Sequence, residues 1–126
     1  MGRFWIGVGL LIGLLVLGFG VSSAMDSAHR EIADTLEQAA QAVFSGEVEE
    51  GVSQAEQAQR KWESCWKATA SAADHEPMDE IDSLFAQMEM YRKFGDQTEF
   101  AACCRRLSQL VRAVGEAHAF NWWNLL

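Results

Sequence analysis

The sequence has little that would interrupt a helix and none of the short motifs that mark common enzyme sites. Its 126 residues include one proline, Pro77, and no alternation of apolar and polar residues bounded by turn residues, so we expect no sheet. Nucleophile-elbow, phosphate-loop, zinc-protease and dinucleotide-binding motifs are all absent, and the histidines His29 and His118 are isolated. These absences predict a protein that is not an enzyme and needs no cofactor.

Basic residues are also scarce. Only Arg3 precedes residue 26, and the chain from residue 26 onward carries nine basic and eighteen acidic residues. A surface of this sign repels nucleic acids and anionic headgroups, so we expect no nucleic-acid partner. The same charge favours a basic protein or a cation as the partner.

One long apolar run is present near the N-terminus. Residues 4–21 are all apolar or glycine, and at about 1.5 Å per residue they form roughly 27 Å of helix, close to the ~30 Å hydrocarbon core of a bilayer. Arg3 precedes this run, and Asp26 is the first charged residue after it. The positive-inside rule then predicts a single-pass protein of the cell membrane, with its N-terminus in the cytoplasm and its acidic part outside.

A cleaved signal peptide is the alternative to an anchor. Ser22, Ser23 and Ala24 are small residues of the kind that signal peptidase requires, but the apolar run exceeds the usual ~7–15 residues. We therefore expect an uncleaved anchor over residues 1–25 and an acidic helical domain over residues 26–126.

Apolar residues recur at steps of three and four in four segments after the run. The expected helices cover residues 26–44, 47–70 and 77–94 and the chain from residue 96 onward. Their connections are short, which makes successive helices antiparallel. The predicted fold is all-α, with an N-terminal transmembrane helix followed by two antiparallel helical hairpins that resemble a four-helix bundle. The expected core residues are Ile32, Leu36, Ala39, Ala40, Val43, Val48, Val52, Ala55, Trp62, Trp66, Thr69, Met78, Ile81, Leu84, Phe85, Met88, Tyr91, Phe100, Cys103, Leu107, Leu110, Val111 and Val114.

Glycine and aspartate mark the ends of these helices. Gly46 and Gly95 follow the first and third helices at positions typical of a C-terminal cap. Asp96 and Glu99 have the spacing of a capping box at the start of the fourth helix. Both features predict tight turns about 50 residues apart.

The residue pattern resembles one protein family. Its elements are Lys61-Trp62 with Trp66, Asp74-His75-Glu76, and the closing Trp123-Asn124-Leu125-Leu126. With an anchor in front, nearly the whole chain is similar to the small bacterial membrane proteins grouped as domain of unknown function 4363. The resemblance implies a single-pass, mostly helical protein on the outer side of a bacterial membrane, and it implies no activity. Pro77 and Met78 stand where the family pattern would have a polar residue.

Two groups of side chains are candidates for a site. The first is the acidic stretch with His75, Glu76 and Asp79, in which His75 and Asp79 are one helical turn apart and could hold a metal together. Acids at a helix start are common as capping groups, so we favour capping and predict no metal. The second is the aromatic set Trp62, Trp66, Tyr91, Trp122 and Trp123. Tryptophans of this kind fill a core, line a groove for a ligand, or lie at a membrane interface; the core is favoured.

The three cysteines leave two alternatives open. Outside the cytoplasm a disulfide persists, and Cys65 would bridge Cys103 or Cys104 if the second and fourth helices were neighbours. Cys103 and Cys104 point about 100° apart in a helix, so they do not bridge each other. Buried thiols are the other alternative.

These features favour an interaction or accessory module with an unidentified protein partner. The alternative is a sensor domain that binds a ligand or metal in a pocket formed by Trp62, Trp66 and Tyr91 with the acids near His75. Burial of the tryptophans with no cavity beside them would argue against the sensor.

Overall fold

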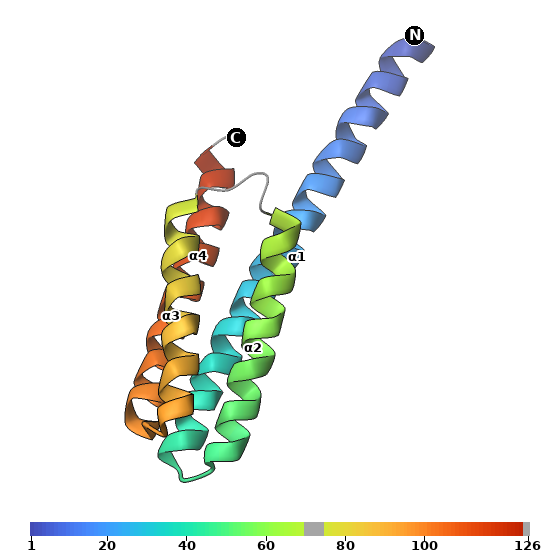
Figure 1. Cartoon of the computed structure of the whole chain (residues 1–126). Coiled ribbons are helices and arrows are strands. Elements are labelled where there is room, and N and C mark those ends of the chain that lie inside the picture. Colours follow the sequence, from blue (N-terminus) through green and yellow to red (C-terminus); the bar gives the residue numbers. More distant parts are fainter. Residues whose placement is uncertain (70–74, 125–126) are drawn as a thin grey trace.

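The computed structural model contains four helices arranged as two antiparallel hairpins (Figure 1). It describes residues 1–69 and 75–124, and the side chains of residues 21–23, 25, 66–69, 75–77 and 118–124 lie outside the description. The helices are α1 (Gly2–Phe44), α2 (Val48–Thr69), α3 (His75–Phe94) and α4 (Gln97–Asn124). The described residues contain no strand, and the predicted all-α fold is confirmed.

Helix α1 joins two elements that the prediction treats separately. The predicted anchor and the predicted first helix of the bundle form one helix of 43 residues. Residues 22–27 between them contain no proline or glycine that would end it. The first half, Gly2–Gly20, is long and apolar enough to cross a membrane and is not buried against the bundle. It projects beyond the other three helices as the blue segment of Figure 1.

Both hairpin turns contain a glycine in the left-handed region. Gly46 has φ 88° and Gly95 has φ 72°. The amide after each glycine donates to the carbonyl five residues earlier, at 2.8 Å after Gly46 and 3.1 Å after Gly95. This is the Schellman pattern, which satisfies carbonyls at the end of a helix. Asp96 Oδ1 also accepts a hydrogen bond from Glu99 N at 3.1 Å, so the predicted cap of α4 forms.

The apolar stripes meet in one core. The predicted core residues found buried are Ile32, Leu36, Ala39, Ala40, Val43, Ala55, Trp62, Met78, Ile81, Leu84, Phe85, Met88, Phe100, Cys103, Leu107 and Val111. Those found half-buried are Val48, Val52, Tyr91, Leu110 and Val114. Trp66 and Thr69 lie outside the described side chains. Helix α1 packs against α2 and α4, and α3 packs against α4.

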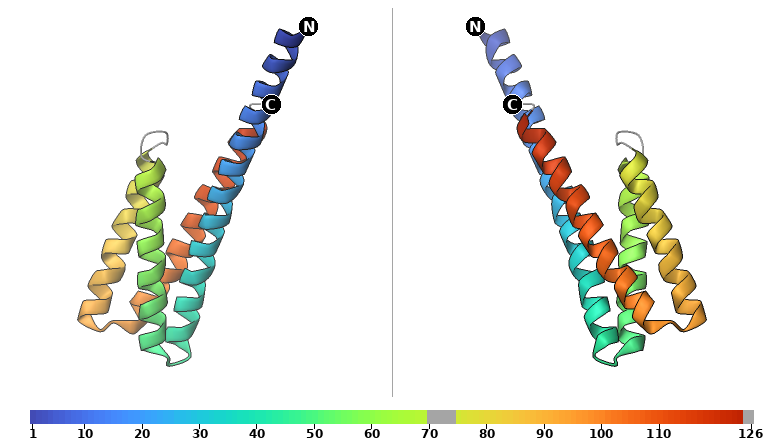
Figure 2. Two further views of the ribbon diagram at one scale, coloured as in Figure 1. Left: turned by 90° about the vertical axis from the view of Figure 1, so that its right-hand side faces the viewer. Right: turned by 90° about the vertical axis from the view of Figure 1, so that its left-hand side faces the viewer.

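The residues of α2 that approach α1 grow in size toward the apolar segment of α1. We call the end of the bundle with the glycine turns the distal end, and the end where the apolar segment emerges the proximal end. From the distal to the proximal end these residues are Gly51, Ala55, Ala58 and Trp62, all buried. A Cβ on Gly51 would lie 2.6 Å from Val43 Cγ2 and 2.8 Å from the Ala39 carbonyl oxygen. Figure 2 shows the pair α1 and α4 diverging from α2 and α3 toward the proximal end, as this gradient of side-chain size requires.

Candidate functional site

Trp62 belongs to a buried contact among three helices. Its side chain is 2% exposed, and its Nε1 donates to Asp82 Oδ1 of α3 at 3.0 Å. His29 of α1 is 4% exposed and meets the Trp62 ring edge-on, with centroids 5.8 Å apart and an interplanar angle of 82°. Such edge-to-face contacts are favourable because the positive edge of one ring meets the negative face of the other. Trp62 therefore ties α1, α2 and α3 together, and His29, isolated in the sequence, is part of this core.

Of the predicted aromatic and acidic residues, the structure describes the side chains of Trp62, Asp79 and Tyr91, and it does not bring Asp79 and Tyr91 together. Tyr91 is half-buried and Asp79 is exposed, and they lie twelve residues apart on α3, about 18 Å along the helix. The predicted residues outside the described side chains are Trp66, His75, Glu76, Trp122 and Trp123. A small depression that Tyr91 lines, together with Val52 and Phe100, does not include Trp62.

The prediction that His75 and Asp79 bind no metal stays a prediction. Among the described side chains, no group of three or more histidine, cysteine, aspartate and glutamate residues is placed to hold a metal ion. Asp79 is described and exposed, whereas its suggested co-ligand His75 is outside the described side chains.

Cys65 and Cys103 are not brought together. Both α2 and α4 start at the distal end, and Cys65 lies seventeen residues into α2 whereas Cys103 lies six residues into α4. Their levels in the bundle therefore differ by roughly 16 Å, well beyond the ~4.4–6.8 Å between Cα atoms that a disulfide allows. The helix register, which the sequence does not reveal, is the reason that the suggested pair does not meet.

Cys103 and Cys104 are thiols that fill the contact between α3 and α4. Cys103 Sγ donates to the Leu84 carbonyl oxygen at 3.2 Å, and Cys104 Sγ lies 3.6 Å from Met88 Sδ. Burial raises the pKa of both thiols, that of Cys104 to about 12. A thiol that stays protonated is a poor nucleophile, so these two residues serve packing.

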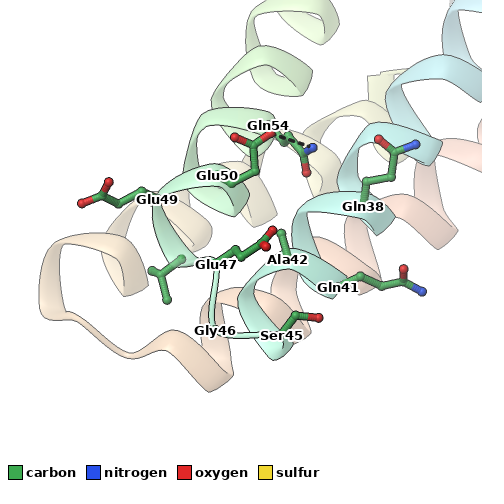
Figure 3. A pocket seen from close by; sticks show the side chains of 10 residues that line it. Gln38, Gln41, Ala42, Ser45, Gly46, Glu47, Glu49, Glu50 and Gln54 are labelled. Atoms are coloured by element: carbon green, nitrogen blue, oxygen red, sulfur yellow. Dashed lines mark hydrogen bonds between the residues drawn. The ribbon is translucent and has the colours of Figure 1, made fainter.

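An open acidic depression lies at the distal end, against the turn between α1 and α2 (Figure 3). It measures about 960 Å³ and is lined by Gln38, Gln41, Ala42, Ser45, Gly46, Glu47, Val48, Glu49, Glu50 and Gln54. Its titratable groups are all carboxylates. Gln54 Nε2 donates to Glu50 Oε1 at 3.3 Å, while Gln54 Oε1 is buried without a hydrogen-bond partner among the described residues. The charge that the depression presents to an incoming group is therefore only negative, beside the neutral amides of its glutamines and the hydroxyl of Ser45.

Large apolar side chains are exposed at the same end of the bundle. Phe44 is 57%, Met90 46% and Phe94 81% exposed. The guanidinium of Arg105 lies over the Phe44 ring, 5.5 Å from its centroid. Phe44 and Phe94 are the last residues of α1 and α3, and the sequence predicts no site at either of them. The distal end thus combines apolar and acidic surface.

The fold defines a class of small helical bundles whose first helix extends into a segment long and apolar enough to cross a membrane. Within that class, the sequence profile of the family described as "Domain of unknown function (DUF4363)" matches residues 19–125, and the chain belongs to this family. The match covers the bundle and begins at the end of the apolar segment, which confirms the predicted family. Searches of curated proteins and of solved structures gave no match.

Proposed function

We propose that this protein is a non-enzymatic accessory module, anchored in a bacterial cell membrane by residues 4–21, which presents its acidic bundle to a protein partner outside the cytoplasm. The exposure of the apolar segment carries the proposal. Apart from Val8, which is half-buried, its described large apolar side chains are between 52% (Leu15) and 73% (Phe19) exposed, and they occupy every face of the helix. A protein partner would cover one face, whereas a bilayer covers all of them.

Charge supports the orientation. Arg3 precedes the apolar segment, and the bundle beyond it is strongly acidic. The positive-inside rule keeps the basic end in the cytoplasm. Fractionation of cells that produce the full chain is expected to leave the protein in the membrane pellet after an alkaline carbonate wash. A C-terminal alkaline phosphatase fusion is expected to be active and a C-terminal green fluorescent protein fusion dark. Release by carbonate would refute the anchor, and the opposite reporter pattern would refute the orientation.

The distal end supports a basic partner with an apolar contact surface. It is the part of the bundle farthest from the anchor (Figure 1), and it carries the acidic depression and the exposed Phe44 and Phe94. Opposite charge would steer the partner, and apolar burial would hold it.

Photo-crosslinking in intact cells tests this part of the proposal. A benzoylphenylalanine placed at Glu49 or at Phe94 is expected to capture the same protein from native membranes. Ser83, also exposed on α3 but closer to the proximal end, is the matched control position. Equal capture at Ser83, or none at Glu49 and Phe94, would contradict a distal docking surface.

A further inference from the structure

One side of α1 is exposed along the length of the bundle. Helices α2 and α4 pack against the opposite side, where Ile32, Leu36 and Val43 are buried. The exposed residues recur at steps of three and four, so they form one line along the helix, which we call the outer face of α1. Its members are Ser27, Glu31, Asp34, Gln38 and Gln41. All are polar and exposed, so this face is accessible to a partner.

The line of the outer face continues into the apolar segment as glycine. Because α1 is one uninterrupted helix, positions can be compared along its whole length. At about 100° per residue, Gly9, Gly13 and Gly20 lie within about 40° of one another, and Gln38 follows Gly20 by about five full turns on the same side. A Cβ on any of these glycines would meet nothing within 4 Å. Glycines let membrane helices approach closely, and the seven-residue step from Gly13 to Gly20 suits a small crossing angle of about 20°.

At the distal end, the two flanks of the outer face carry opposite charges. On the α2 flank, Glu50 lines the acidic depression together with Gln41 of α1 (Figure 3). On the α4 flank, the guanidinium of Arg105 lies over the ring of Phe44. Both charges are therefore level with the last turn of α1, one on each side of its exposed surface.

Closer to the apolar segment, the signs on the two flanks are exchanged. On the α2 flank, Lys61 forms an ion pair with Glu31 of the outer face. On the α4 flank, Glu116 lines a cavity of about 240 Å³ with Asp34 of α1. The two arginines of that cavity are paired with carboxylates of their own chain, whereas Glu116 is exposed and has no ion pair among the described side chains. The α2 flank thus runs from acidic to basic and the α4 flank from basic to acidic.

We propose that two copies of this chain pair side by side in the membrane, with the outer face of one α1 against the outer face of the other. A two-fold axis parallel to α1 sets the α2 flank of each copy opposite the α4 flank of the other. Glu50 then faces Arg105 of the second copy, and Lys61 faces Glu116 of the second copy, so the surface is complementary to itself in charge.

This inference rests on the proposed anchoring by residues 4–21. Two copies anchored in one bilayer with the same orientation hold their flanks at the same height, which is the arrangement that the charges require. The pairing leaves the proposed distal partner its contacts. Glu49 points away from the depression in Figure 3, and Phe94 lies on α3, on the far side of α4 from α1.

Cysteine crosslinking in native membranes tests the proposal on the full chain. Gln38→Cys places a thiol on the outer face of α1. Ser53→Cys is the matched control, because Ser53 is exposed on α2 two residues after Gly51, which meets Ala39. With a short bismaleimide, we expect Gln38→Cys to give a species of twice the 14.0 kDa chain mass and Ser53→Cys to stay at the level of the wild-type chain. Equal crosslinking at the two positions would refute the pairing.

Charge reversal on the Gln38→Cys background tests the flanks. Glu50→Arg or Arg105→Glu alone sets like charges opposite each other at two symmetric positions, and we expect either to lower crosslinking about threefold or more. The two substitutions together are expected to restore it. Glu49→Arg is the matched control and is expected to change little, because Glu49 points away from α1 (Figure 3). A double variant that crosslinks no better than the single ones would contradict the proposed pairing.

Glycine substitution tests the part of the face inside the apolar segment. Gly13→Leu fills this face and is expected to lower crosslinking several-fold, whereas Gly7→Leu, about 140° away from Gly20 around the helix, is expected to leave it unchanged. Equal effects of the two would refute the glycine contact. An alkaline carbonate wash of the same membranes separates the two proposals: protein that stays in the pellet without specific crosslinking refutes the pairing while the anchor stands, and protein that is released refutes both. Unchanged helicity by circular dichroism shows that each variant is folded.

Discussion

At the scale of single residues, Gly51 decides how closely α1 and α2 approach. Alanine is favoured over glycine inside a helix by about 1 kcal/mol, so propensity alone predicts that Gly51→Ala stabilises the protein. A Cβ there would lie 2.8 Å from the Ala39 carbonyl oxygen and 2.6 Å from a Val43 methyl group, and the backbone atom is not free to rotate away. We expect Gly51→Ala to lower the free energy of unfolding by about 1–3 kcal/mol, measured by urea denaturation in a mild detergent.

The control for this prediction is Ser53→Ala, an exposed position on the same helix. It gains propensity without meeting a neighbour and is expected to be neutral or slightly stabilising. A Gly51→Ala protein at least as stable as the Ser53→Ala protein would show that the two helices do not meet at Gly51.

The hydrogen bond from Trp62 to Asp82 links α2 to α3. Trp62→Phe keeps an aromatic ring against His29 and removes the donor, while Asp82→Ala removes the acceptor. Because Asp82 is exposed, we expect a coupling free energy of about 0.5–1.5 kcal/mol in a double-mutant cycle. Additive effects of the two substitutions would mean that the bond contributes no stability.

Cys104 makes stability depend on pH in alkaline solution. Its pKa is raised by burial from 9.0 to about 12, so between these values the thiol ionises in the unfolded chain and stays protonated in the folded one. Unfolding then releases a proton, and stability falls as pH rises above about 9, by up to ~1.4 kcal/mol per pH unit until the folded thiol ionises as well. The fall in unfolding free energy between about pH 9 and pH 10 is expected to be smaller in Cys104→Ala. An equal fall in both proteins would contradict the assignment.

At the scale of helices, the two glycine turns set the hairpin geometry. Gly95 has φ 72° and open space around its Cα, so a side chain there meets backbone strain rather than a neighbour. We expect Gly95→Ala to cost about 1–2 kcal/mol of stability in thermal or urea unfolding. Gly95→Asn is the matched variant, because asparagine tolerates the left-handed region better, and it is expected to lose less. Equal losses in the two variants would mean that strain at φ is not the cause.

Most of this helical architecture could be predicted because local signals agree with tertiary packing. The stripes with Ile32 and Leu36 in α1, or Leu107 and Val111 in α4, point to one core, and the two glycines end their helices as their positions suggest. The contact that Gly51 makes with α1 could not be predicted from such local signals. A glycine in a helical pattern looks like a weak point, and only the position of the neighbouring helix turns it into a contact.

The contact among His29, Trp62 and Asp82 was less predictable, because it too depends on where neighbouring helices lie. His29, Trp62 and Asp82 come from three helices, and they meet only once the register of those helices is set. Periodicity gives the face of each helix but not its sliding position against the next. The pairing of Cys65 with Cys103 was plausible from helix faces alone, whereas their different levels follow from the register.

At the scale of the whole molecule, the continuous α1 bears on whether the N-terminal segment is removed. Ser22, Ser23 and Ala24 lie within one helix that runs from the apolar segment into the bundle. Proteases cleave chain that is locally opened, and a helix held by the bundle on one side and lipid on the other opens rarely there. We therefore expect the protein extracted from membranes to have the mass of the full chain, 14.0 kDa, by intact mass spectrometry. A helix-breaking variant, Gly20→Pro, is the positive control and is expected to yield some chain that begins at Met25. A wild-type protein that itself begins at Met25 would refute the anchor and leave the bundle, whose buried residues start at His29, as a secreted domain.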